Sequence, residues 1–174
     1  MKKLLATLLL AGLALSACGQ TAKKPVSEPA EPAQGTTYQQ ELADKIQQLK
    51  LREDDLKGSS FGAYELVEEI NENRYGLGGR EIHLQKDDET VFTARYMTLA
   101  SEEALKENFT AIADASDITR STEIGDETLT TELNKKITFR KDGIKMDVSL
   151  AVGYFAEHSL DELRELAELM VDKV

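Results

Sequence analysis

Residues 135–153, KKITFRKDGIKMDVSLAVG, place the strongest constraint on how this chain can fold. In the first run, before Asp142, Ile137 and Phe139 alternate with polar neighbours. In the second run, apolar residues recur at every second position from Ile144 to Val152. Successive side chains of a β-strand point to opposite faces of a sheet, so this period predicts strands with one apolar face. Asp142-Gly143, between the runs, is a preferred sequence for a two-residue hairpin turn. We therefore predict a β-hairpin with one face on a core and the other wet or lightly covered.

Three further segments are predicted strands, and three are predicted amphipathic helices. Alternating patterns rich in β-branched and aromatic residues indicate strands, whereas apolar residues three or four positions apart indicate helices. The predicted strands are AYELVEEI (63–70), REIHLQ (80–85) and TVFTARYMTL (90–99). The predicted helices are YQQELADKIQQLKL (38–51), SEEALKENFTAIADA (101–115) and SLDELRELAELMVDKV (159–174).

The helix boundaries carry capping signals. Ser101 is the expected N-cap of the second helix, and Ser159 with Glu162 forms a capping-box pattern before the last helix. The first helix has a narrow apolar stripe, so it either docks on the domain edge or extends the segment before it.

Strands that occur in runs, with helices between and after them, predict an α+β domain in which helices pack on an antiparallel β-sheet. This element order, with IGDE at 124–127 before a hairpin and a leucine-rich helix at the end, resembles the Mog1/PsbP-like α/β sandwiches of several exported bacterial lipoproteins. In that group the domain usually serves as an interaction or accessory module. The resemblance therefore implies a role other than catalysis.

The N-terminus has the pattern of an export signal. Lys2 and Lys3 precede LLATLLLAGLALSA (4–17), an apolar stretch of 14 residues. A helix that crosses a membrane needs about 20 apolar residues, so this stretch is too short for a stable span. We expect residues 1–17 to be a signal peptide that is removed from the mature protein.

Leu15, Ser16, Ala17 and Cys18 resemble the lipobox of bacterial lipoproteins. The resemblance implies that Cys18 receives a diacylglyceryl group on its thiol and that signal peptidase II cuts between Ala17 and Cys18. Two acyl chains anchor a protein stably, so we expect it on the cell membrane or outer membrane, with its domain outside the cytoplasm. The alternatives are an ordinary secretory signal with a chance cysteine, or an N-terminal membrane anchor that is never cut.

A tether and a single domain are expected after the signal. Residues 18–36 hold the lipidated Cys18 and GQTAKKPVSEPAEPAQGT, which contains all three prolines of the chain. This composition cannot bury enough apolar surface to order itself, so the segment is a predicted flexible tether. The length of residues 37–174 fits one domain with its own core. Cys18 is the one cysteine of the chain, so its lipidation leaves no thiol for a disulfide or a metal.

The net charge of the chain limits the classes of partner that it can bind. The formal net charge is −11, and it is near −13 once Lys2 and Lys3 are removed with the signal. Nucleic acid binding needs clustered lysine and arginine, so we expect no nucleic acid partner. An acidic exported domain can instead bind cations or basic partners, although a solvated, soluble surface explains the same charge.

No motif in the sequence indicates a catalytic or metal site. His83 lies between Ile82 and Leu84, so alternation places it on the opposite face, exposed, while His158 precedes the last helix. We expect YGLGGR (75–80) to form turns, since it lacks the lysine and serine or threonine of a phosphate loop. KDDET (86–90) is a predicted charged hairpin turn, because it lacks the central glycine of a calcium loop. We therefore predict no catalytic residues, no metal ligands and no cofactor.

These patterns lead to one main hypothesis and two alternatives. The main hypothesis is a cell-envelope lipoprotein, anchored through Cys18, whose acidic domain binds a protein or small ligand without catalysis. The first alternative is a small hydrolase or metal-dependent enzyme with a site assembled from dispersed carboxylates. The second is a solute-binding lipoprotein. A buried, convergent group of carboxylates and histidine would favour the enzyme.

Overall fold

The computed structural model describes residues 37–70, 79–115 and 117–174. The predicted signal peptide (1–17), Cys18, the predicted tether and most of the predicted turn YGLGGR (75–80) lie outside these residues. The helices are α1 (Thr37–Gln48), α2 (Glu53–Leu56), α3 (Glu102–Ala113) and α4 (Leu160–Val171). The strands are β1 (Glu65–Ile70), β2 (Arg80–Lys86), β3 (Glu89–Met97), β4 (Ile118–Ser121), β5 (Glu127–Thr131), β6 (Lys136–Lys141) and β7 (Ile144–Leu150).

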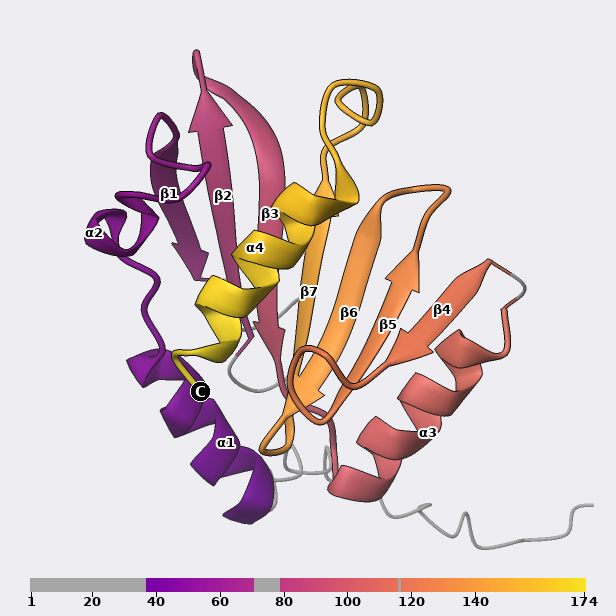
Figure 1. Cartoon of the computed structure of the whole chain (residues 1–174). Coiled ribbons are helices and arrows are strands. Elements are labelled where there is room, and N and C mark those ends of the chain that lie inside the picture. Colours follow the sequence, from indigo (N-terminus) through magenta and orange to yellow (C-terminus); the bar gives the residue numbers. More distant parts are fainter. Residues whose placement is uncertain (1–36, 71–78, 116) are drawn as a thin grey trace, which may run out of the picture. The chain divides into compact units, whose positions relative to one another are not determined.

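The strands form one seven-stranded sheet in the order β1-β2-β3-β7-β6-β5-β4. Every neighbouring pair is antiparallel, and Figure 1 shows helices packed on the sheet. The prediction of an α+β fold with an antiparallel sheet is confirmed. Strand β7 pairs with both β3 and β6, so the last strand of the chain joins the two halves of the sheet.

One face of the sheet is apolar and carries the main core. Pairs such as Ala94 with Val148 and Phe139 with Met146 lie side by side on this face. Helix α4 crosses it over β7 and β6 (Figure 1). Its spacing predicts a core-facing stripe, of which four members are fully buried: Leu163, Leu166, Ala167 and Met170. The fifth predicted member, Leu160 in the first turn, is only half-buried. The apolar residues at every second position of the strands and the apolar stripe of α4 therefore pack into a single core.

Helix α1 docks on this core, which decides between the two expectations for it. Ile46 is fully buried, and Leu42 belongs to the same cluster. At the end of the helix, the guanidinium of Arg80 donates hydrogen bonds to the carbonyls of Gln47 and Leu49 and forms an ion pair with Glu68. Arg80 is only 2% exposed. This buried cation holds α1 against the first two strands.

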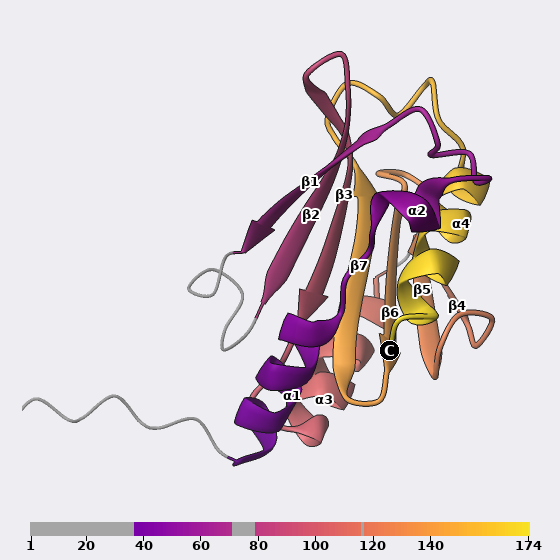
Figure 2. The same ribbon diagram turned by 90° about the vertical axis from the view of Figure 1, so that its left-hand side faces the viewer.

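Helix α3 covers part of the opposite face. Leu105 and Phe109 form a second, smaller core with Leu129 of β5, whose register partner Thr138 places it on the face opposite Phe139. Figure 2, a view turned by 90°, shows α3 and α4 well apart. Both predicted caps are confirmed: Ser101 accepts from Ala104 N, and Ser159 and Glu162 form a reciprocal capping box.

Two hairpin turns have the geometry that their sequences predict. Asp142 and Gly143 have φ of 50° and 78°, and Asp87 and Asp88 have φ of 53° and 64°. Positive φ at both central residues defines the type I′ turn, whose twist matches that of the flanking strands. KDDET is therefore confirmed as a hairpin turn between β2 and β3.

The KDDET turn yields a stability prediction. We expect Asp87→Asn combined with Asp88→Gly to raise the free energy of unfolding by roughly 0.5 kcal/mol, because asparagine and glycine adopt positive φ at lower cost. Chemical denaturation measures the change. A decrease of more than about 1 kcal/mol would show that the two carboxylates stabilise the fold.

Four local features differ from the sequence predictions. Val152 does not continue the β7 pattern: the strand ends at Leu150, the chain turns away, and Val152 is 91% exposed. The short elements α2, β4 and β5 were not predicted, because four or five residues are too few to show a clear period. Within the described residues, no helix combines the length and apolarity needed to span a membrane.

Candidate functional site

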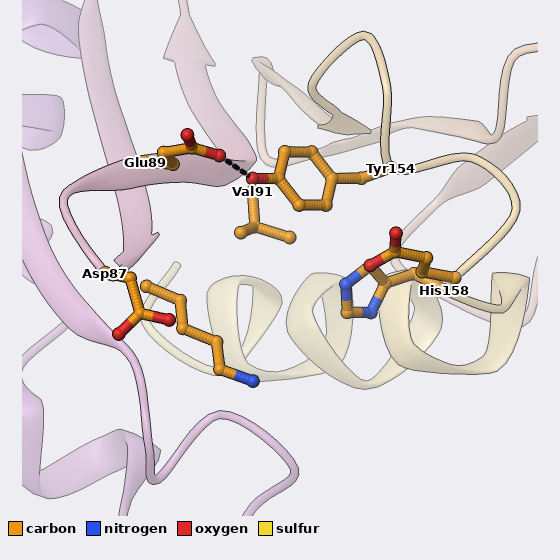
Figure 3. A pocket seen from close by; sticks show the side chains of 7 residues that line it. Asp87, Glu89, Val91, Tyr154 and His158 are labelled. Carbon is orange, nitrogen blue, oxygen red and sulfur yellow. Dashed lines mark hydrogen bonds between the residues drawn. The ribbon is translucent and has the colours of Figure 1, made fainter.

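A hollow of about 290 Å³ lies between the β2–β3 turn and the loop before α4. Figure 3 shows Asp87 and His158 on opposite sides of it, with Val91 between them. The lining residues come from two distant parts of the chain: Lys86, Asp87, Glu89, Val91, Tyr154, Glu157 and His158. Strand pairing between β3 and β7 brings these two parts together.

The loop that forms one wall is held by Lys135. Its ammonium group donates hydrogen bonds to the carbonyls of Phe155 and His158. Lys135 lies in the β5–β6 turn with φ of 40°. Ala151 N donates to Val91 O at 2.8 Å and fixes the start of the same loop. These contacts position Tyr154 and Glu157, which no helix or strand holds.

The hollow is acidic. Asp87, Glu89 and Glu157 contribute three carboxylates, against the single ammonium group of Lys86. The Tyr154 hydroxyl donates a hydrogen bond to Glu89, as Figure 3 shows. This bond to the carboxylate raises the pKa of Tyr154, so the hydroxyl keeps its proton at neutral pH. An aromatic ring beside several carboxylates is suited to a positively charged group.

His158 closes the opposite side of the hollow. Its ring packs edge-on against Phe92, with centroids 4.9 Å apart, and its Nδ1 lies 3.1 Å from Glu162 Oε1. The position before the last helix is as predicted, and Glu162 is the residue of the capping box. Its contribution to a hollow was missed, because the partner segment lies far away in the sequence.

The sheet face opposite α4 carries a second group of interest, a network of charged side chains. Glu81 and Asp147 on this face are 4% and 5% exposed, although the sequence predicted a wet or lightly covered surface. They are buried because oppositely charged neighbours pack over them and neutralise them. The ion pairs are Arg95–Glu81 at 2.8 Å, Lys136–Asp147 at 3.0 Å and Arg140–Glu127 at 3.0 Å.

Lys145 links this network to α3. Its Nζ donates to Asn108 Oδ1 at 2.9 Å. Burial lowers the pKa of Lys145, while the neighbouring Asp147 carboxylate acts in the opposite direction. The network of charged side chains therefore extends to α3, the helix that carries the second core.

His83 lies in the same network and corrects one prediction. It is on the face opposite Ile82 and Leu84, as alternation predicted, but its side chain is only 20% exposed. Glu81 and Glu69 flank it, with oxygens 3.0 Å and 3.7 Å from its Nε2. His158 packs on Phe92, on the other face of the sheet, so the structure does not bring the two histidines together.

Comparisons with known proteins identify no relative. No protein family model, no curated protein and no solved structure matches the chain.

Proposed function

We propose that this protein is a cell-envelope lipoprotein, anchored through a lipid on Cys18, whose domain binds a positively charged group without catalysing a reaction. The observation that carries the binding role is the acidic hollow lined by Asp87, Glu89 and Glu157. The export signal and lipobox of residues 1–18 support the anchor.

The size and chemistry of the hollow support a small ligand or one side chain of a partner. Its volume of about 290 Å³ is near the lower end of the range for small-molecule sites. The Tyr154 ring and the carboxylates converge on one space, and the net charge of the chain attracts cations from a distance. A primary amine, such as a lysine side chain, fits these features.

Binding of trilysine to the purified full chain tests this role. We expect saturable binding by isothermal titration calorimetry and a loss of at least about tenfold when Asp87→Asn, Glu89→Gln and Glu157→Gln are combined, which corresponds to about 1.4 kcal/mol. Glutamine at position 89 can still accept the Tyr154 hydrogen bond, so the wall of the hollow is preserved.

A matched control separates the hollow from overall charge. Glu107→Gln, Asp114→Asn and Asp172→Asn remove the same number of charges at exposed positions outside the hollow. We expect this variant to bind trilysine within about twofold of the wild type, because exposed charges act weakly at a distance in salt. Equal losses in both variants, or no binding by the wild type, would refute the proposed site.

A further inference from the structure

Glu69, Glu81 and His83 form a compact group of metal-ligating atoms on the charged face of the sheet. One ligand atom from each side chain lies within 4.8 Å of the other two. His83 Nε2 is 3.0 Å from Glu81 Oε1 and 3.7 Å from Glu69 Oε2. Ligand atoms of a tetrahedral zinc ion, with bonds near 2.0 Å, are about 3.3 Å apart, so only small side-chain movements are needed.

The backbone register places two like charges opposite each other. Glu69 of β1 is the direct partner of Glu81 of β2. Facing residues on one side of an antiparallel pair are close neighbours, and like charges there destabilise the sheet. A bound cation between the two carboxylates would relieve this repulsion.

Glu81 is already oriented as a metal ligand. Its side chain is 6% exposed, and its Oε2 accepts a hydrogen bond of 2.8 Å from Arg95 Nε. This bond directs Oε1 towards His83. Carboxylates that bind metals are commonly held by such a second hydrogen bond, so Arg95 acts as a positioning residue.

The surroundings of His83 affect the expected affinity for a metal ion. Its Nδ1 is buried and has no hydrogen-bond partner among the described residues. When Nε2 binds a metal ion, the ring proton lies on Nδ1, which is then a buried donor without an acceptor. The same absence removes the usual support of a ligating histidine. We therefore expect affinity about 10- to 100-fold below that of a fully supported site.

We propose that Glu69, Glu81 and His83 bind Zn²⁺ through one imidazole nitrogen and two carboxylate oxygens. Hard cations such as Mg²⁺ and Ca²⁺ prefer all-oxygen sites, whereas zinc accepts a mixed nitrogen and oxygen set. Three protein ligands leave a fourth position open for water or a ligand group, as in zinc sites that act on bound molecules. This site lies on the face opposite the Phe92 contact of the acidic hollow and does not depend on the proposed amine binding.

Zinc titration of the full chain tests the site. The chain carries Cys18→Ser, so that no thiol competes, and it is purified in detergent without a histidine tag. We expect one Zn²⁺ per chain by calorimetry, no comparable binding of Mg²⁺, and a zinc-dependent shift of the His83 ring signals in NMR spectra. Glu69→Gln and His83→Gln should each weaken zinc binding by more than about tenfold, since each removes a direct ligand.

Controls keep the test decisive even if one variant folds poorly. Glu69 is 60% exposed, so Glu69→Gln should retain the fold, which circular dichroism without zinc verifies. Glu65→Gln, on the same face of β1, and His158→Gln, the other histidine, should bind zinc like the parent chain. Zinc binding unaffected by Glu69→Gln, or the absence of saturable binding, would overturn the proposal. Trilysine binding should be unchanged in Glu69→Gln, so the two proposed sites fail or succeed separately.

Discussion

Cys18→Ser is expected to move the protein from the membrane fraction to the soluble fraction, or to leave it as an uncut precursor. In the proposed anchor the Cys18 thiol is the nucleophile that accepts the diacylglyceryl group, and a hydroxyl would not replace it. Two acyl chains give stable anchoring, whereas a single acyl chain binds a membrane reversibly, with an association constant of about 10⁴ M⁻¹. Fractionation of bacterial cells, labelling with radioactive palmitate and intact mass measurement of the mature N-terminus report the change.

The position of the thiol supplies the control. Cys18→Ser combined with Ser27→Cys restores one cysteine outside the lipobox, and we expect no lipid on it. The domain should keep the circular dichroism spectrum of the wild type, because the substituted residues precede α1. Membrane partition and palmitate labelling that persist in Cys18→Ser would contradict the proposed anchor.

Arg80→Met is expected to lower the free energy of unfolding by about 3 kcal/mol. Methionine retains much of the apolar volume but cannot donate to the carbonyls of Gln47 and Leu49, and it leaves Glu68 without its ion pair. Loss of a buried donor that leaves its acceptors unsatisfied costs about 1–3 kcal/mol, and breaking a buried ion pair costs about 3–5 kcal/mol. Glu68 is 27% exposed and regains some hydration, so we expect a value between these ranges.

Urea denaturation of the full chain measures this loss. Arg164→Met serves as the matched control, because Arg164 on α4 is 40% exposed and pairs with the exposed Asp161. Surface ion pairs contribute little, so the control should change stability by less than about 0.5 kcal/mol. A loss below about 1 kcal/mol for Arg80→Met would show that α1 is held by its apolar contacts alone.

Elements with a clear period were predictable because their signals are local. The 135–153 hairpin, the capped helices α3 and α4, and the apolar stripe of α4 all follow from side-chain spacing and backbone turn preferences. Short elements were not predicted for the same reason, since α2, β4 and β5 are too brief to show a period. The prediction that Val152 continues the buried pattern of β7 was wrong, because the alternation of apolar residues in the sequence extends past the point where the chain leaves the sheet.

Both proposed sites depend on contacts that no local pattern contains. The acidic hollow requires the loop near Tyr154 to lie against the β2–β3 turn, which follows from the pairing of β3 with β7. The Glu69, Glu81 and His83 group requires the β1–β2 register, since a shift by one residue would place Glu69 on the other face. His83 was assigned to the correct face, but its two partners were not identified.

The sequence by itself determined the element types, the core-facing stripes, the hairpin turns and the expectation of a lipid anchor, because each depends on neighbouring residues. Only the tertiary structure decided the strand order, the docking of α1 by Arg80 and the convergence of distant charged side chains. Those features form only when segments far apart in the chain become ordered together, because the surface that they bury jointly must offset the conformational entropy that they lose. No short stretch of residues contains both of these quantities.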